Sequence, residues 1–315
     1  RILSGYGYQL RTIEVEGIRG KGILRSFIGI SRIPKSIFQS RSIIRSFVPH
    51  IVLGVGGYAS GPAVMAAHFM GIKTAIAEQN MLPGFTNRIL GRFVEKVFLT
   101  YPDRNKFFQE KKVIVTGNPV RADICGNSKE TRENKEKLAI LIFGGSQGAS
   151  SINRAVTESI TFLKDVRDNM LFMHQTGEKD FDEISKVYRE NNIDADVLPF
   201  ITDMARAYRW ADLVICRAGA TSIAEITAMG RASILIPYPH AVGNHQVLNA
   251  QVLHDAGASH MILEDELTGE MLASLLRLFH SKRNMITEME IKSKKLGKKK
   301  AAADIVDGCL ALQGV

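Results

Sequence analysis

LAILIFGGSQGASSINRAVTESITFL, residues 138–163, joins an apolar run to a helix-like run through a glycine-rich turn. The six apolar residues from Leu138 to Phe143 have the length of a buried strand, and residues 151–163 are expected to form a helix. Gly144 to Gly148 lie between the two. A strand, a tight turn and a helix in that order are typical of an α/β domain with a parallel sheet.

The same alternation of strand-length apolar runs and helical segments extends in both directions from this stretch. Before it, strands are expected at 50–55, 73–77, 97–100 and 112–115, with helices at about 60–70 and 87–94. After it, strands are expected at 170–174, 196–199, 213–216, 232–236 and 260–263. Residues 127–137 are polar and charged, so we expect them to link two similar α/β domains in tandem.

Composition agrees with two globular domains, since 315 residues with 45% hydrophobic and 23% charged side chains can bury two cores. The three cysteines are scattered and match neither a metal site nor a redox pair, which fits a reducing, cytoplasmic compartment. Residues 46–72 carry no charged side chain and could cross a bilayer. Two prolines and five glycines interrupt them, however, which favours a strand, a turn and a helix.

Positive charge is concentrated near the start of the chain, whose net charge is +9. Between Arg19 and Arg45 there is no acidic residue, and the seven basic ones are Arg19, Lys21, Arg25, Arg32, Lys35, Arg41 and Arg45. Basic and apolar residues alternate there, which makes a surface able to dock on anionic lipid. The alternative is a solvated helix face over a core. No nucleic-acid-binding motif accompanies the charge, and we expect no nucleic-acid partner.

Two turns in the second half could hold an anion. Gly144 to Gly148 precede a helix, so their backbone N–H groups and the Ser146 hydroxyl can face a phosphate. RAGATSIAE, residues 217–225, repeats this arrangement after an apolar strand. There Thr221 and Ser222 could bind phosphate or merely cap the helix, and Glu225 could bind ribose hydroxyls or merely be a first-turn acid.

The first glycine turn has a rival interpretation. Gly54-x-Gly56-x-x-Ala59 follows a strand, and Glu78 lies about twenty residues further on, as in the dinucleotide-binding fingerprint. An NAD(P)- or flavin-dependent oxidoreductase is therefore the alternative function. Against it, the fingerprint usually lies in the first βαβ unit of its domain, and the two turns of the second half would remain unexplained.

Five motifs occur together in this chain: GGYASGP at 56–62, EQN at 78–80, GNPVR at 117–121, GGSQGA at 144–149 and NHQxxNA at 244–250. In this order they closely resemble the MurG family of N-acetylglucosaminyltransferases, from about Gly17 to the C-terminus. The resemblance implies two Rossmann-like domains facing across a cleft, of the GT-B type. The first would be residues 1–121, with a helix from about 297–315 packing back on it, and the second would be residues 122–296.

The resemblance also implies the roles of individual residues. The second domain would bind UDP-N-acetylglucosamine through Arg121, Ser146, the backbone at Ile201, residues Ala220, Thr221, Ser222, Ile223, Ala224 and Glu225, and Gln246, with Asn80 reaching it from the first domain. The acceptor diphosphate would lie on the loop of Gly56, Gly57, Tyr58, Ser60 and Gly61. Glu78 is the candidate base, with a structural role equally open.

The reaction implied is inverting transfer of N-acetylglucosamine to the 4-hydroxyl of an undecaprenyl-pyrophosphoryl-N-acetylmuramoyl-pentapeptide. It would take place at the cytoplasmic face of the bacterial plasma membrane, where the enzyme would be peripheral. We expect no cofactor and no obligatory metal. The family begins with a strand and a glycine-rich loop ending in His, which are absent here. We therefore expect a fragment with an incomplete first domain, able to bind donor but inactive in transfer, and an inactive nucleotide-binding membrane homologue is a further alternative.

Overall fold

The computed structural model describes residues 7–15, 33–126 and 136–314, which fall into two compact units. Unit 1 is Arg1–Gly117 with Ala302–Val315, and unit 2 is Asn118–Ala301. The first boundary lies four residues before the expected one. Val120 packs against the core of unit 2, and the Arg121 side chain lies beside Glu225 of that unit, so residues 118–121 of the GNPVR motif belong there.

Unit 1 contains a parallel sheet whose strands follow each other in chain order, β1-β2-β3-β4. They are β1 (Ile51–Gly54), β2 (Lys73–Glu78), β3 (Lys96–Leu99) and β4 (Val113–Val115). Helices α2 (Ile33–Phe47), α3 (Ser60–Phe69), α4 (Phe85–Leu90) and α13 (Ala301–Leu310) accompany the sheet, with short helices η2 (Glu110–Lys112) and η5 (Ala311–Gln313).

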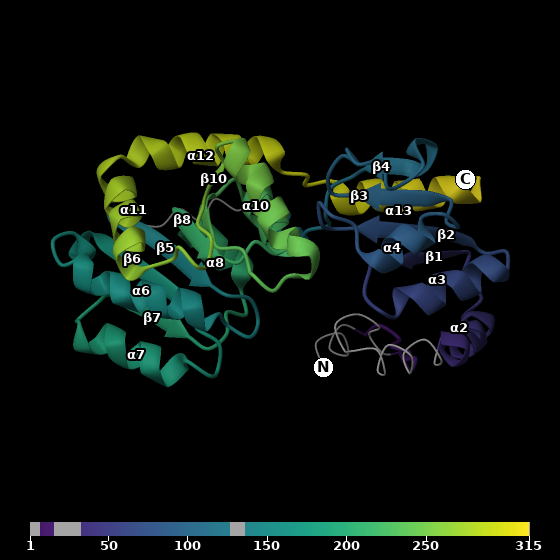
Figure 1. Cartoon of the computed structure of the whole chain (residues 1–315), viewed down its shortest axis with the longest axis horizontal. Helices are drawn as coiled ribbons and strands as arrows, with labels where there is room; N and C mark the ends of the chain where they lie inside the picture. The colour runs from purple at the N-terminus through teal and green to yellow at the C-terminus, as the bar shows by residue number, and fades with distance from the viewer. Residues whose placement is uncertain (1–6, 16–32, 127–135, 315) are drawn as a thin grey trace. The chain divides into compact units, whose positions relative to one another are not determined.

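Alternation along β2 and β3 explains how this sheet is covered, because successive side chains point to opposite faces. Ile76, Val97 and Leu99 form one buried cluster with Val64 of α3 and Leu90 of α4. Ala75, Ala77 and Phe98 form another with Ile305 of α13. Figure 1 shows the yellow C-terminal helix α13 lying against β3, more than 200 residues away in the chain.

Unit 2 contains a six-stranded parallel sheet in the order β10-β9-β8-β5-β6-β7. The strands are β5 (Leu138–Phe143), β6 (Met170–Gln175), β7 (Ala195–Leu198), β8 (Leu213–Cys216), β9 (Ala232–Leu235) and β10 (Ser259–Met261). Its helices are α5 (Ala122–Cys125), α6 (Ser150–Phe162), α7 (Phe181–Glu190), α8 (Met204–Trp210), α9 (Ala220–Met229), α10 (His245–Asp255), α11 (Gly269–Ser281) and α12 (Arg283–Leu296), with short helices η3 (Arg167–Asn169) and η4 (Val242–Asn244).

The six residues of β5 are all buried, because helices cover both faces of the sheet. Leu138, Ile140 and Ile142 pack with α6 and α11, while Leu141 and Phe143 pack with α8 and α9. The strand order reverses between β5 and β8, which are direct neighbours although three strands apart in sequence. Open α/β sheets bind ligands at this switch point, outside the carboxyl ends of the strands.

The expected strands are confirmed: within the described residues, each of the ten strands ends within two residues of its expected bounds, and β5 and β8 agree fully. Residues 46–72 contain the end of α2, then β1 and α3, as expected. In the part of the chain that the structure describes, no helix is long and apolar enough to cross a membrane.

Candidate functional site

The glycine turn after β5 lies at the switch point of unit 2. Gly145 and Gly148 have φ angles of +92° and +76°, which favour glycine. A Cβ on Gly148 would be 2.0 Å from the Thr176 carbonyl oxygen, so the turn packs directly on the backbone after β6. Ser146 lies in this turn and is exposed. Helix α6 follows with Ala149 at its N-cap and no side-chain cap, so its first N–H groups can face a ligand.

The turn after β8 ends in a second uncapped helix. Gly219 is the N-cap of α9, and no side chain caps the helix, so the interpretation of Thr221 and Ser222 as caps is wrong. Free amides of the first turn can be supplied by Ala220, Thr221 and Ser222. Ile223 differs, because its amide donates to the Gly219 carbonyl at 3.0 Å and closes the first turn. Ala224 follows it, one residue deeper in the helix.

Glu225 lies in the second turn of α9 and is buried, so the alternative that it is merely a first-turn acid is wrong. Its Oε2 accepts a hydrogen bond from the Tyr208 hydroxyl at 3.0 Å. Arg121 Nε lies 3.9 Å from Oε1. Burial raises the pKa of Glu225, although the Tyr208 hydroxyl and the Arg121 guanidinium act in the opposite direction. The site therefore holds a desolvated carboxyl group beside a half-exposed arginine.

Arg217, which the sequence interpretation missed, ties the two turns together. It follows β8 directly, and its Nη2 donates to the Ser151 hydroxyl of α6 at 2.9 Å. The same guanidinium pairs with Glu264 and donates to the Ile236 and Pro237 carbonyls at 3.3 Å. Its place immediately after a strand was the only signal in the sequence. The contact fixes the start of α6 against the end of β8.

The remaining expected donor residues of unit 2 lie on the same edge of the sheet. Ile201, after β7, donates its amide to Gln175 Oε1 at 2.8 Å, so it can offer a ligand only its carbonyl. Gln246, in the first turn of α10, accepts a hydrogen bond from the Tyr238 amide on its Oε1 at 3.0 Å. Nearby, Asn249 is fully buried and 3.5 Å from the Ala218 carbonyl.

In unit 1, the glycine turn after β1 precedes α3. Gly56 and Gly57 have φ angles of +90° and +76°. The Ser60 hydroxyl donates to the Gly56 carbonyl at 2.5 Å, so it is used within the turn. Tyr58 is 56% exposed, and α3 has no side-chain cap. The turn can thus offer backbone amides to an anion, as the Gly144–Gly148 turn can in unit 2.

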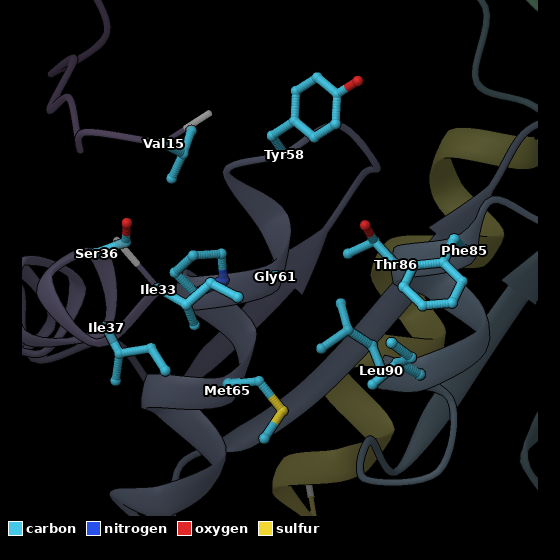
Figure 2. Close-up of a pocket in the computed structure, with 12 residues that line it drawn as sticks. Val15, Ile33, Ser36, Ile37, Tyr58, Gly61, Met65, Phe85, Thr86 and Leu90 are labelled. Atoms are coloured by element: carbon cyan, nitrogen blue, oxygen red, sulfur yellow. The ribbon is translucent and has the colours of Figure 1, made fainter. Parts of the chain in front are cut away.

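An apolar cavity of about 210 Å³ opens beside this turn. Figure 2 shows Tyr58 and Gly61 on one side of it, Ile33 and Ile37 of α2 on another, and Met65 of α3 below. Side chains of α4, including Phe85 and Leu90, complete the lining. An anion-facing turn and an apolar cavity are therefore adjacent in unit 1.

Glu78, the candidate base, is 4% exposed at the end of β2. Its Oε1 accepts from the Asn80 amide at 3.0 Å and from Asn80 Nδ2 at 3.3 Å. Its Oε2 accepts from the Gly84 amide at 2.9 Å and from Asn87 Nδ2 at 2.8 Å. Both oxygens are occupied by the loop before α4 and by Asn87 of α4, which favours the structural role over the catalytic one. The same bonds leave no place for the ribose contact that the dinucleotide fingerprint requires of Glu78.

We therefore expect Glu78→Gln to lower the free energy of unfolding of unit 1 by about 2–3 kcal/mol. The glutamine NH₂ would replace one carboxylate oxygen, so it would face N–H donors that have lost their buried acceptor. Denaturant unfolding measures this, with Glu110→Gln, an exposed change in the same unit, as the control. A normal stability combined with a large loss of kcat would instead identify Glu78 as the base.

A buried network supports the Gly144–Gly148 turn from below. His174 of β6 is fully buried, with Nε2 3.0 Å from Asn153 Oδ1 and Nδ1 3.1 Å from the Tyr188 hydroxyl. Asn153 Nδ2 donates to the Thr176 carbonyl at 2.9 Å, which assigns Oδ1 as acceptor and Nε2–H as the neutral histidine tautomer. Burial lowers the pKa of His174 to about 3.

This pKa predicts an acid sensitivity of unit 2. The unfolded chain binds a proton at His174 below about pH 6.5, whereas the folded one does not until about pH 3. Stability is therefore complete above pH 6.5 and falls by about 1.4 kcal/mol per pH unit as the pH drops through that window. Denaturant unfolding between pH 7 and pH 4.5 measures the slope of the free energy of unfolding against pH. In His174→Gln this slope should be smaller by the contribution of one proton. Equal slopes would contradict the assignment.

Metal ligands give no competing interpretation in the described residues, where no group of three His, Cys, Asp or Glu side chains could hold an ion. The chain contains two Asp-x-Asp sequences, Asp180-Phe181-Asp182 and Asp194-Ala195-Asp196. The first begins α7, where Asp180 accepts a hydrogen bond from Asn153 Nδ2 at 2.9 Å. The second lies at the amino end of β7, opposite the edge that carries the turns, and Asp194 pairs with Lys137. The expectation that no metal is needed stays a prediction.

Two parallel α/β units, with anion-facing turns at the carboxyl edge of each sheet, define the class of two-domain nucleotide-sugar enzymes. Family models narrow this class. Residues 139–305 match the glycosyltransferase family 28 C-terminal domain, and residues 1–99 match its N-terminal domain.

Relatives agree with these matches. The chain is 51% identical over 99% of its length to the UDP-N-acetylglucosamine--N-acetylmuramyl-(pentapeptide) pyrophosphoryl-undecaprenol N-acetylglucosamine transferase of Syntrophus aciditrophicus, covering 86% of it. It is 46% identical over 99% to the enzyme of that name from Myxococcus xanthus, covering 82% of it. The crystal structure of Acinetobacter baumannii MurG matches 98% of this chain and 86% of that one, with 31% identity and a TM-score of 0.78. The chain therefore belongs to glycosyltransferase family 28, in the MurG group, and the expected fold class is confirmed.

Proposed function

We propose that the chain transfers N-acetylglucosamine from UDP-N-acetylglucosamine to the 4-hydroxyl of an undecaprenyl-pyrophosphoryl-N-acetylmuramoyl-pentapeptide, in peptidoglycan synthesis. The observation that carries this proposal is the 51% identity, over 99% of the chain, to a transferase named for this donor and acceptor. The alternative of an NAD(P)- or flavin-dependent oxidoreductase is wrong, because the chain belongs to a glycosyltransferase family.

The geometry of unit 2 supports it as the donor site. A UDP moiety carries a diphosphate and a ribose. The diphosphate needs backbone N–H groups or cationic side chains as donors, and the ribose hydroxyls need an acceptor such as a carboxylate. Ser146 and the start of α9 provide uncapped amides and hydroxyls for the diphosphate, and Arg121 provides a cation. Glu225, held by Tyr208, can accept from the ribose hydroxyls. Gln246 would meet the sugar hydroxyls.

The mechanism we propose is direct displacement. The acceptor 4-hydroxyl attacks the anomeric carbon, the bond to the UDP oxygen breaks, and the configuration inverts. Negative charge builds on the leaving diphosphate. Helix N-termini near Ser146 and Ser222 stabilise that charge as it develops, because their amides are already oriented and need no reorganisation. The residue that removes the proton from the acceptor hydroxyl is not assigned, since Glu78 is occupied by its own loop.

Unit 1 supports binding of a lipid acceptor. Its glycine turn at Gly56, Gly57, Tyr58, Ser60 and Gly61 suits a diphosphate, and the apolar cavity beside it suits hydrocarbon. A diphosphate joined to an isoprenoid chain presents these two chemistries next to each other. Tyr58 and Gly61 line both the turn and the cavity.

We also propose that the enzyme acts at the cytoplasmic face of the plasma membrane. Most of the basic segment Arg19 to Arg45 lies outside the described residues. Within α2, Lys35 pairs with Glu14, whereas Arg41, Arg45 and the 70%-exposed Phe38 share one solvent-facing side. Exposed basic and aromatic groups together favour docking on anionic lipid. Co-sedimentation with anionic vesicles tests this proposal. A variant with both Arg41→Glu and Arg45→Glu should bind the vesicles less than the parent does, and equal binding would contradict the proposal.

Calorimetry and a transfer assay test the function together. We expect UDP-N-acetylglucosamine to bind more tightly than NADH, and labelled N-acetylglucosamine to reach a lipid-linked acceptor. Tighter binding of NADH than of UDP would contradict the donor site. Donor binding without transfer would favour the inactive nucleotide-binding homologue.

A further inference from the structure

Gln175, the last residue of β6, makes two hydrogen bonds to the main chain on either side of its strand. It is 3% exposed. Its Nε2 donates to the Gly145 carbonyl at 2.8 Å, in the turn after β5. Its Oε1 accepts from the Ile201 amide at 2.8 Å, in the segment after β7. One buried amide side chain thus spans three neighbouring strand ends at the edge that carries the donor site.

The first bond orients the peptide between Gly145 and Ser146. In a trans peptide the carbonyl and the following N–H point in opposite directions. Since the Gly145 carbonyl points at Gln175, the Ser146 N–H points away from Gln175. The Gly148 amide donates to the same carbonyl at 3.0 Å and closes the turn. The turn therefore presents an N–H to an anion instead of a carbonyl oxygen, which would repel it.

The second bond orients the peptide between Phe200 and Ile201 in the same way. The Ile201 N–H points at Gln175, so the Phe200 carbonyl points away from it. This segment reaches the surface, where the Phe200 side chain is 48% exposed. An outward carbonyl accepts a hydrogen bond. The imide N–H of uracil can donate one, whereas the ring nitrogen at the same position of cytosine is an acceptor.

We propose that Gln175 is a positioning residue of the donor site, which sets the Gly145–Ser146 peptide for the diphosphate and the Phe200–Ile201 peptide for the base. This inference rests on the proposed function, because it takes a uracil nucleotide as the ligand. Gln175 touches no substrate in this arrangement. It acts through two peptides that are 30 and 26 residues away in the chain.

Two substitutions separate the two bonds. Gln175→Glu, measured at a pH at which its carboxyl is ionised, keeps an oxygen for the Ile201 amide but cannot donate to Gly145, whereas Gln175→Leu makes neither bond. Affinities for UDP and CDP, measured by calorimetry on the full chain, read out the two peptides separately. The phosphate-facing turn affects both nucleotides equally, and the base-facing peptide affects their ratio.

We expect the parent protein to prefer UDP over CDP. Gln175→Glu should weaken both nucleotides by roughly tenfold or more and keep the ratio, because hydrogen bonds to charged groups are lost at the turn alone. Gln175→Leu should lose affinity and the preference for UDP together. If Gln175→Leu does not fold, Gln175→Asn replaces it in the test. Its side chain is one methylene shorter and cannot reach both peptides, so it should also lose affinity and the preference for UDP.

Ile286→Val is the control for a purely structural effect. It shortens a buried core side chain of α12 in the same unit without touching either peptide, so it should lower Tm and leave both nucleotide affinities unchanged. Gln175 variants that lower Tm but keep the parent's affinities and ratio would overturn the proposal. Failure of the parent protein to bind UDP would instead overturn the proposed function, and the inference with it.

Discussion

Replacing Gly148 with alanine should lower the free energy of unfolding of unit 2 by about 3 kcal/mol or more and abolish measurable donor binding. Two effects add. Gly148 has a φ of +76°, which costs an alanine conformational energy, and the new Cβ would lie 2.0 Å from the Thr176 carbonyl oxygen. That neighbour is backbone, so it cannot rotate away, and the Gly144–Gly148 turn must move. Thermal unfolding and UDP calorimetry measure the two consequences.

Gly145→Ala is the matched comparison, because it tests backbone conformation without a clash. Gly145 has a φ of +92°, but nothing lies within 4 Å of the position of a Cβ. We expect this variant to lose about 1–2 kcal/mol of stability. If both variants lost the same amount, contact with the Thr176 backbone would not be what requires glycine at 148.

Local sequence patterns predicted the elements of this fold well because strands such as β5 and β8 are short apolar runs bounded by glycine or charged residues. β5 is an example, since its six residues are all buried and a glycine follows directly. The position of its turn then follows from the chain alone. Neighbouring positions on α9, such as Thr221 and Ser222, were also placed correctly at a helix start, although their role as caps was wrong.

Partners distant in the chain were not predictable from these patterns. Gln175 reads as the end of a strand, and nothing local shows that its amide reaches Gly145 and Ile201. Tyr208 reads as one apolar position of a helix, yet its hydroxyl holds Glu225, 17 residues away. Glu78 matched a nucleotide-binding spacing, but its four hydrogen bonds come from the loop that follows it and from Asn87 of α4. Such pairings depend on strand order and helix packing, which a single sequence does not specify residue by residue.

Glu225→Gln and Glu225→Ala should weaken UDP-N-acetylglucosamine binding by about 1.5–3 kcal/mol, roughly ten- to hundredfold, because a charged acceptor for the ribose hydroxyls is lost. The parent's affinity should also fall on acidification. Burial raises the pKa of Glu225, so its carboxylate is protonated at a higher pH than an ordinary glutamate. Calorimetry across pH 5 to 8 measures both effects, and a glutamine variant should lose this part of the pH dependence.

Stability should change in the opposite direction, which separates a binding role from a folding role. A raised pKa means that the folded protein favours the neutral carboxyl, so stability falls as the pH rises from the ordinary glutamate range through the raised value. Wherever its carboxyl is ionised, Glu225 therefore costs stability, and Glu225→Gln, which keeps an oxygen for the Tyr208 hydroxyl, should raise Tm there while it weakens donor binding. Glu290→Gln is the control. Glu290 lies on α12 and pairs with Arg231, and burial raises its pKa too. This control should leave donor affinity unchanged. A Glu225→Gln variant with lower Tm and parental affinity would show that the carboxylate serves the fold and not the ligand.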